Sequence, residues 1–478
     1  FIGLSILPNA KIEIDSLEVS FEKEDVSINE YFSGNILLIC PGYPMVKNKY
    51  LFSFIHSRVQ AYKENKLNVD VAVVHSEYIE KTEFATFENV DYIRTGYNQI
   101  RNLLQVRKYD KILIHFFDPA YFQLLEPQDL SNTQIILYSH GTDALYRAFD
   151  VIGRPYFVSD YVVPESFTKT FALRDYYIKK YNNLPNVKFV FVSNWAKKMS
   201  EELLKIKYNN AEVIPCFIDE KQFPYTEKDP ELRKRVFVLR KFDDLSTYSI
   251  DIDVRVILEL SHRKCFNDME FSIYGDGGIH DKLVEPLRKF SNVHIYRKFL
   301  SHDEIKMMQK ENGIGLFATR FDTQAVSSCE AAMAGCVVVS SKNVGTCEYI
   351  DPKIGAFCET ENIIEYADLI EELYNDPKLF KTMSEKMHDS VMKTCSYKYS
   401  IKKDMDMILS FDKTEKIKVP DIKKNPILSI VIPSYNVGKY IKGGVKSLLR
   451  SKYASDLEII IVNDGSKDDT VAKSNELL

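Results

Sequence analysis

The sequence predicts an α/β protein built from doubly wound parallel sheets. Short apolar runs alternate with helical stretches through most of the chain, which is the order expected when helices join parallel strands. The runs are continuously apolar, as strands buried on both faces are. Several runs lead into turns rich in glycine or proline, and the ligands of such sheets bind at this end of the strands.

The first alternation occupies residues 34–220. Its first strand, 35–40, ends in the turn Pro41-Gly42-Tyr43-Pro44, and a helix with one apolar face follows. The other expected elements are strands at 69–74, 111–115, 134–138 and 187–192 and helices at 97–106 and 194–204. We interpret residues 1–33 as an N-terminal tail or the remnant of a preceding region.

The second alternation lies in residues 221–410, which open with a proline-punctuated connection at 223–230. Its expected elements are strands at 235–239, 270–274, 293–296, 313–318 and 336–340 and helices at 251–261, 279–290, 303–309, 363–374, 381–393 and 397–409. Two α/β domains of similar length leave a cleft between them, so we expect the main ligand to bind there.

The stretch 321–350 combines two acids with a short helix and a strand. Ser327 and Glu330 have the spacing of a capping box, and Gly335 is expected to end the helix. Unpaired amides at the start of this helix would attract an anion. Asp322 and Glu330 are eight residues apart and would serve different atoms of one ligand. From the residues alone, a purely structural role for both acids stays equally open.

Three other groups stand at strand ends. His140-Gly141-Thr142-Asp143 follows a strand of the first domain, where a hydrogen-bonded structural histidine is the more common case. Gly275-Asp276-Gly277-Gly278 lies between a strand and a helix, where glycine permits close approach to a ligand. Arg240-Lys241 would bring two cations near a phosphate, with a solvated strand end as the alternative.

Composition excludes several function classes. A net charge of −5 over 478 residues offers no footprint for nucleic acid. Eight scattered cysteines form no CxxC pair, which argues against a zinc site or a disulfide framework and favours a reducing cytoplasm. The histidines form no metal-ligand doublet, and no apolar run is long enough to span a bilayer. We therefore expect no metal and no other cofactor.

The composition changes near the end of the chain. Residues 411–426 are charged and proline-punctuated, as linkers are. A new α/β unit then begins at 427 and reaches only 478, which is too short for a domain. We expect the chain to be a piece of a longer protein.

With these motifs in view, residues 35–410 resemble the retaining glycosyltransferases of family 4, which have the two-domain GT-B fold. The family carries an acid, seven residues and then a glutamate ahead of a small apolar helix, and Asp322 and Glu330 match this spacing. The resemblance implies that Glu330 holds the ribose of a sugar nucleotide. It also implies that Asp322, with the amides of Thr323, Gln324, Ala325 and Val326, meets the donor sugar and diphosphate.

The resemblance extends to the other groups at strand ends. It implies that Arg240 neutralises the departing diphosphate, that the turn Gly275-Asp276-Gly277 lies against the nucleotide, and that His140 contacts the donor sugar. The turn with Gly42 and Tyr43 would approach donor and acceptor. Two departures stand out: the first acid is usually Glu, and the family's lysine five residues after the arginine is Leu245, which leaves Lys241 as its nearest substitute.

The last fifty residues resemble the start of a family 2 glycosyltransferase with a GT-A fold. Their motifs are LSIVIPSYN and EIIIVNDGSKDDT, and Asp464 matches an aspartate that contacts the nucleotide base. The metal-binding acids of that family lie further on, so we expect this segment to be catalytically silent here.

Together these resemblances imply a metal-independent, retaining transferase. It would move a sugar, from a UDP-sugar by preference, to a glycan, glycoprotein or lipid-linked acceptor in bacterial surface polysaccharide or glycoconjugate assembly. We expect a cytoplasmic protein, with peripheral association at the inner face of the membrane through the acceptor left open. Two alternatives remain: a degenerate glycan-binding module that serves the downstream GT-A domain, and a GT-B sugar-nucleotide epimerase.

Overall fold

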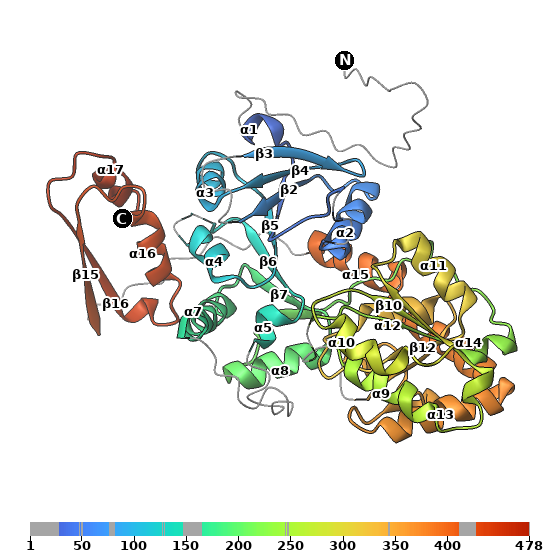
Figure 1. Cartoon of the computed structure of the whole chain (residues 1–478). Helices are drawn as coiled ribbons and strands as arrows, with labels where there is room; N and C mark the ends of the chain where they lie inside the picture. The colour runs from blue at the N-terminus through green and yellow to red at the C-terminus, as the bar shows by residue number, and fades with distance from the viewer. Residues whose placement is uncertain are drawn as a thin grey trace, which may run out of the picture. The chain divides into compact units, whose positions relative to one another are not determined.

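A computed structural model describes residues 28–46, 48, 51–75, 82–126, 128, 130–146, 165–243, 245, 248–342, 345–410 and 427–477. The chain divides into two compact units, whose helices and strands are labelled in Figure 1. The first contains the described residues up to His115, the segment Ala120–Ile135 and the C-terminal segment. The second contains Phe116–Pro119 and the described residues from Ile136 to Ser410. The expected tail falls mostly outside the described residues and the expected linker entirely so, and the predicted domain boundaries stay predictions.

The first unit holds strands in the order β3-β4-β2-β1-β5. These strands are β1 (Ile36–Cys40), β2 (Val69–Val74), β3 (Glu83–Phe87), β4 (Val90–Thr95) and β5 (Lys111–His115). They pair in parallel except for the β3–β4 hairpin, which the sequence analysis missed. The helices are α1 (Ile28–Tyr31), α2 (Ser53–Glu64), α3 (Tyr97–Val106) and α4 (Pro119–Leu125), whose first residue belongs to the second unit.

The second unit continues with strands in the order β6-β7-β8, although Gln134 and Ile135 at the start of β6 belong to the first unit. Its elements here are β6 (Gln134–Ser139), α5 (Thr142–Leu145), α7 (Glu165–Asn182), β7 (Val187–Phe191), α8 (Asn194–Leu204) and β8 (Ala211–Val213). β6 and β7 are buried along their lengths apart from Lys188, which agrees with the continuous apolar runs of the sequence.

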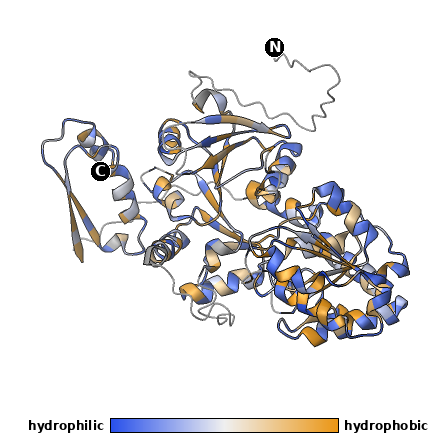
Figure 2. Cartoon of the chain, viewed as in Figure 1, coloured by the Kyte–Doolittle hydropathy of each residue, from blue (hydrophilic) through white to orange (hydrophobic). Residues whose placement is uncertain are grey.

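A six-stranded parallel sheet follows, in the order β11-β10-β9-β12-β13-β14. Its strands are β9 (Arg235–Leu239), β10 (Glu270–Gly275), β11 (Val293–Arg297), β12 (Ile314–Phe317), β13 (Val337–Ser341) and β14 (Phe357–Cys358). Its helices are α9 (Ile250–Leu260), α10 (His280–Val284), α11 (His302–Glu311), α12 (Val326–Met333), α13 (Ile363–Asn375), α14 (Pro377–Thr394) and α15 (Tyr397–Ser410). Hydrophobic residues run along the strands, whereas the helices alternate between hydrophobic and hydrophilic residues (Figure 2).

Two helices of this region differ in how well they were predicted. The helix expected over 279–290 is instead the short α10 followed by a 3-10 turn at Glu285–Leu287, because a proline at 286 cannot continue an α-helix. The end of α12 is as predicted. Gly335 has a φ of 88°, its amide donates to Ala332 O at 3.0 Å, and the Cys336 amide donates to Ala331 O at 2.9 Å, which is a Schellman ending.

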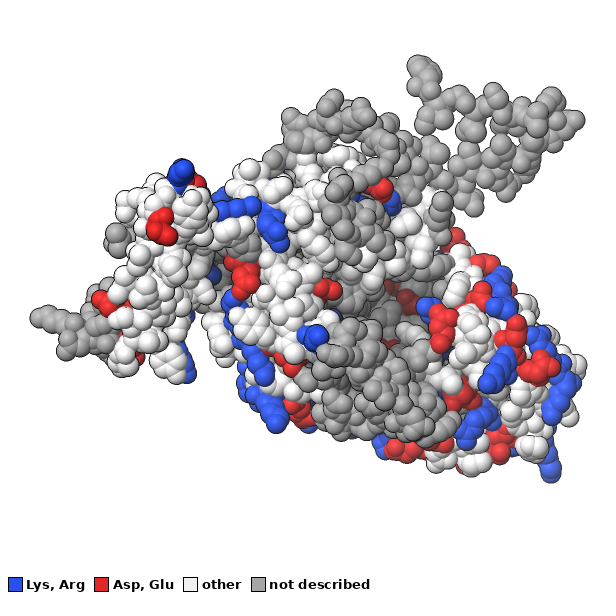
Figure 3. All heavy atoms as spheres, turned by 60° about the vertical axis from the view of Figure 1, so that its left-hand side comes forward, with Lys and Arg blue, Asp and Glu red and all other residues white. Residues whose placement is uncertain are grey.

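The C-terminal segment forms two parallel strands and two helices. They are β15 (Leu428–Ser434), α16 (Ile441–Leu449), β16 (Leu457–Asn463) and α17 (Thr470–Asn475). Over the described ranges of the chain, no helix is both long and apolar enough to cross a membrane. Positive and negative side chains are interspersed on the face drawn in Figure 3.

Candidate functional site

The polar residues of the second unit meet where the strand order of its six-stranded sheet reverses. The chain passes from β9 to β10 on one side of β9 and returns with β12 on the other side. Doubly wound sheets bind ligands at such a switch point, beyond the carboxyl ends of the strands. The loop after β9 carries Arg240, and the loop after β12 leads through Asp322 into α12.

Arg240 is only 5% exposed, and its guanidinium bridges these two loops. Nη2 donates to Thr319 Oγ1 at 3.0 Å and Nη1 to Ser327 Oγ at 3.3 Å. Its buried Nε donates to none of the residues that the structure describes. Because both partners are neutral hydroxyls, the charge of Arg240 stays available to an anion.

Three residues that the sequence analysis missed surround Arg240. The rings of Tyr248 and Phe317 lie 5.2 and 4.7 Å from the guanidinium carbon. Asp253 on α9 is fully buried, and its Oδ1 accepts from the Ala318 amide at 2.9 Å. Burial raises the pKa of Asp253 to about 7, against the opposing effect of Arg240. None of the three stands in a motif, so only the fold shows that they meet.

Asp322, and not Ser327, stabilises the start of α12. Oδ1 of Asp322 accepts from the amides of Gln324 at 3.2 Å and Ala325 at 3.0 Å. The helix begins directly after Ala325, which has a left-handed φ of 57°, so Ser327 lies inside the first turn. The predicted capping box of Ser327 and Glu330 is therefore wrong, because the helix starts before Ser327 rather than after it.

The first two amides of α12 are free to bind a ligand. Among the described residues, the amides of Val326 and Ser327 find no acceptor. Unpaired amides at a helix N-terminus attract anions. The hydroxyl of Ser327 also receives the bond from Arg240. The Arg240 guanidinium is therefore close to the free amides of Val326 and Ser327, because it bonds to the Ser327 side chain.

Two side chains of this loop, those of Thr323 and Gln324, bind it to earlier segments of the second unit. Thr323 Oγ1 donates to the carbonyl of His140 at 3.1 Å. The amide group of Gln324 makes two bonds to the backbone of Cys216, each of 2.7 Å. Of the predicted ligand contacts, the amides of Gln324 and Ala325 are engaged by Asp322, which leaves the amides of Thr323 and Val326.

His140 is brought to this loop by a rigid turn after β6. Asp143 is buried and accepts from the amides of His140 at 3.0 Å, Gly141 at 2.8 Å and Phe117 at 3.1 Å. Burial raises the pKa of Asp143, although these amide bonds oppose the shift. The ring of His140 lies 4.8 Å from that of Phe116. The fold thus places the predicted His140 next to Thr323.

Glu330 is half-buried in α12, and its carboxyl group forms no hydrogen bond to a described residue. Burial raises the pKa of its carboxyl from 4.5 to about 8. A carboxylate in such a place is unfavourable until a ligand supplies hydrogen bonds. Two adjacent hydroxyls, as in a ribose, would satisfy both of its oxygens.

The glycine turn after β10 packs tightly against the Arg240 loop. A Cβ at Gly275 would lie 1.8 Å from the Arg240 carbonyl, and one at Gly277 would lie 2.4 Å from Asp243 Oδ1. Both glycines have positive φ, of 150° and 154°. Only glycine allows the turn to pack this closely against the backbone of Arg240, so the turn helps to position that residue.

Substituting Gly275 with alanine should destabilise the second unit by about 2–4 kcal/mol, because the new methyl group clashes with backbone and the φ is unfavourable. Gly278→Ala is the matched control, since a Cβ there meets no atom within 4 Å. Thermal denaturation of both variants tests this. Equal midpoints for Gly275→Ala and the unmodified protein would show that the turn is not packed as described.

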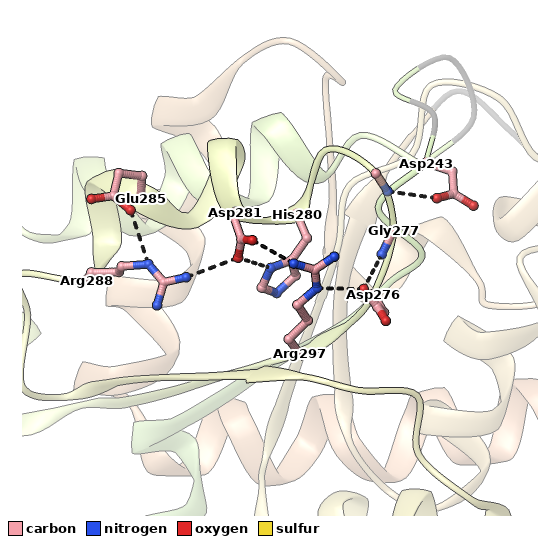
Figure 4. A network of polar contacts seen from close by, with 9 residues as sticks. Asp243, Asp276, Gly277, His280, Asp281, Glu285, Arg288 and Arg297 are labelled. Atoms are coloured by element: carbon pink, nitrogen blue, oxygen red, sulfur yellow. Dashed lines mark hydrogen bonds and ion pairs between the residues drawn. The ribbon is translucent and has the colours of Figure 1, made fainter.

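A surface network fixes the same turn from outside (Figure 4). Arg297 Nε donates to Asp276 Oδ1 at 2.8 Å, and its Nη1 donates to Asp281 Oδ2 at 2.6 Å. The bond from Arg297 holds the pKa of Asp276 below its ordinary range, and the pKa of Asp281 is lowered mainly by its hydrogen bond with His280. Asp276 also accepts from the Gly277 amide at 2.8 Å. Asp276, one of the predicted nucleotide contacts, is thus bound within the protein.

Comparison with known proteins now gives these residues a context. Residues 254–389 match the family model described as glycosyl transferases group 1, and residues 429–478 match that of glycosyl transferase family 2. Residues 254–389 are thus similar to group 1 glycosyltransferases, and we use the name group 1 domain for residues 221–410, which include this match. The two-part resemblance inferred from the sequence is thereby confirmed.

Solved structures show the GT-B fold. A glycosyltransferase from Rickettsia africae has a TM-score of 0.58 and 16% identity, with 80% of this chain and 99% of that one covered. Sucrose-phosphate synthase from Thermosynechococcus elongatus has a TM-score of 0.57 and 12% identity, covering 78% and 98%. The predicted fold class is confirmed.

Curated relatives cover the chain unevenly. An uncharacterised glycosyltransferase of Methanocaldococcus jannaschii is 24% identical over 332 residues, which are 68% of this chain and 81% of that protein. A chondroitin synthase of Escherichia coli is 46% identical over 61 residues, which are 13% of this chain and 9% of that protein. The chain thus spans only a small part of this second relative.

The second departure from the family pattern is Leu245, which stands where the family has a lysine. Leu245 packs against the hydrophobic core, so it offers no charge to a phosphate. Lys241 is an exposed side chain paired with Asp243 at 2.7 Å. Its assignment as the second diphosphate contact stays a prediction.

Two predicted site residues belong to the first unit, and a third to the family 2 segment. Gly42 and Tyr43 are buried in the turn after β1. Asp464 is exposed directly after β16, and its amide donates to Ser434 O at 3.0 Å. Their ligand contacts stay predictions.

Proposed function

We propose that the group 1 domain transfers a sugar, with retention, from a nucleotide-sugar to a hydroxyl of a glycan, glycoprotein or lipid-linked acceptor. The arrangement that carries this proposal is the buried Arg240 beside the two free amides of α12. A cation with two aligned N–H donors suits a departing diphosphate. Glu330, three residues after Ser327 in the same helix, suits the ribose of that nucleotide.

The transfer would need no protein nucleophile. The acceptor oxygen attacks the anomeric carbon on the face that the diphosphate leaves, and the acceptor's proton passes to the departing phosphate oxygen. Asp322 is not placed as a nucleophile, because its carboxylate binds the amides of its own loop. The protein's contribution is electrostatic stabilisation of the charge that develops on the diphosphate.

The donor class is tested by thermal shift against UDP-, GDP- and dTDP-sugars, followed by assay of sugar transfer. We expect a UDP-sugar to give the largest shift, and we expect transfer to continue in excess EDTA because Arg240 and the helix amides supply the positive charge. The family 2 segment is expected to add no activity. Loss of transfer on chelation, with restoration by a divalent cation, would contradict the metal-independent mechanism.

A degenerate glycan-binding module is the second candidate. It is favoured by the engagement of Asp322 within its loop and by the apolar Leu245 where the family has lysine. Slow hydrolysis of the nucleotide-sugar separates the two, because it requires a competent transfer site. If no sugar shifts the melting temperature and none is hydrolysed, the binding module is the better description.

The biological setting is also part of the proposal. Two glycosyltransferase segments in one chain suit the assembly of a bacterial surface polysaccharide or glycoconjugate. We place this reaction in the cytoplasm, at the inner face of the membrane when the acceptor is lipid-linked.

A further inference from the structure

The first unit contains a row of three hydrogen-bonded polar side chains, two of them buried, that the proposed reaction does not use. His56 Nδ1 lies 2.9 Å from the hydroxyl of Tyr43, and its Nε2 lies 3.1 Å from Glu88 Oε2. The exposed fractions of His56 and Tyr43 are 4% and 2%. Glu88 reaches in from the surface, where Gln60 also donates to it at 3.2 Å.

The chemistry of the partners assigns the proton of His56. A carboxylate only accepts hydrogen bonds, so Nε2 carries the proton and donates to Glu88. Nδ1 then accepts from the Tyr43 hydroxyl, whose pKa is raised by burial. The row thus runs in one direction, from Tyr43 through the neutral imidazole to Glu88.

Glu88 occupies this position against its backbone preference. It forms the β3–β4 turn with Asn89, and the two residues have φ values of 42° and 63°. Glycine and asparagine favour such a turn, whereas glutamate does not. Lys63 Nζ holds the turn by a 2.5 Å bond to the Asn89 carbonyl. The turn is therefore fixed so that the carboxylate meets His56.

The other end of the row fixes the turn after β1. β1 lies between β2 and β5, so the strand order of the first unit reverses beside it. Ligands of doubly wound sheets bind at this point. Tyr43 is part of this turn, and the Tyr92 hydroxyl donates to the Pro44 carbonyl at 3.3 Å. The conformation of the turn thus depends on how Tyr43 is held.

We propose that His56 and Glu88 are positioning residues that hold Tyr43, and with it the turn 41–44, in the conformation that binds the sugar acceptor. This inference rests on the proposed function, which supplies the acceptor. The predicted donor groups lie in the second unit. Breaking the row should therefore weaken acceptor binding more than it slows reactions of the donor alone.

Two substitutions of His56 separate positioning from mere core packing. Asparagine places a polar atom where Nδ1 stands and keeps a partner for Tyr43, whereas glutamine reproduces Nε2 and keeps only Glu88. We expect His56→Gln and Tyr43→Phe to raise the acceptor KM about tenfold, the loss of one hydrogen bond of ordinary strength. His56→Asn should stay within about threefold of the unmodified enzyme. Equal effects of asparagine and glutamine, or a parallel loss of donor hydrolysis, would overturn the proposal.

The pH dependence of kcat/KM for the acceptor gives a second test of the positioning role of His56. Burial lowers the pKa of His56 below 6.5, Lys63 lowers it further, and Glu88 raises it. Tyr43, the other group facing the ring, stays protonated. Below the His56 pKa both ring nitrogens carry protons and the Tyr43 hydroxyl loses its acceptor, so kcat/KM for the acceptor should fall. Glu88→Gln should move this fall to lower pH by removing the charge that favours the imidazolium. An unchanged profile would overturn the proposal.

A measurement without substrates distinguishes failure of this inference from failure of the proposed function. Hydrogen exchange of the peptide covering residues 41–46 should become at least threefold faster in His56→Gln and stay unchanged in His56→Asn. If no nucleotide-sugar is bound or hydrolysed by the unmodified protein, the proposed function fails. In that case the exchange data alone decide whether His56 holds the turn. Unchanged exchange in His56→Gln would show that His56 does not hold it.

Discussion

Arg240→Ala should lower the rate of sugar transfer by about 10²–10³-fold, the usual cost of removing one group that stabilises charge in a transition state. Arg240 is the one predicted catalytic residue whose buried charge faces free helix amides in the described part of the chain. Its loss would leave the departing diphosphate with the amides of α12 alone. The donor should still bind, because Glu330 is unaffected.

The variant is expected to fold, since the contacts that the structure describes for the Arg240 side chain are with two neutral hydroxyls and two aromatic rings and leave no charge unpaired. Removing its charge raises the pKa of the buried Asp253 above about 7, so stability should be compared at pH 6, where that carboxyl is neutral. Arg235→Ala is the matched control, because this exposed arginine lies at the other end of β9. Transfer at the unmodified rate in a folded Arg240→Ala protein would remove Arg240 from the mechanism.

Features set by neighbouring residues could be predicted from the sequence. The buried strands of the six-stranded sheet appear as continuous apolar runs, and Gly335 ends α12 because the next backbone step needs a left-handed residue. The β3–β4 hairpin was missed because its turn, Glu88-Asn89, contains no glycine. The capping box failed for a related reason: buried Ala325 adopts a left-handed φ that alanine alone does not favour.

Some residues of the candidate site could be predicted from the sequence, and others are found only in the fold. Arg240, His140 and Glu330 could be predicted because each stands at a strand end or in a motif. Asp253 and Tyr248 could not, since they reach Arg240 through the packing of α9 and of the loop before it. The engagement of Asp322 by its own loop was equally invisible, because it depends on the backbone path from Asp322 to Ala325.

Glu330→Gln should weaken donor binding by about 10–100-fold, because a hydrogen bond to a charged group contributes about 1.5–3 kcal/mol. In the free protein the carboxyl has a pKa of about 8, and hydrogen bonds from ribose hydroxyls favour its charged form. Donor binding at pH 7 should therefore release a proton. Calorimetry in buffers of different ionisation enthalpy measures this release, which the variant should lack.

The same substitution should raise the stability of the folded protein, although it weakens donor binding. Because the folded pKa of about 8 exceeds the ordinary 4.5, the unfolded chain binds fewer protons between these values, and the unmodified protein loses stability as pH rises through this window. Glu330→Gln removes that loss, so its advantage in melting temperature should grow from pH 5 to pH 8 and then stay constant. Glu372→Gln, an exposed glutamate on α13, should change neither affinity nor this profile. A residue that merely supports the helix would lower stability when replaced. Weaker donor binding together with higher stability of Glu330→Gln at pH 8 would thus identify Glu330 as a ligand-binding carboxylate that lowers the stability of the folded protein.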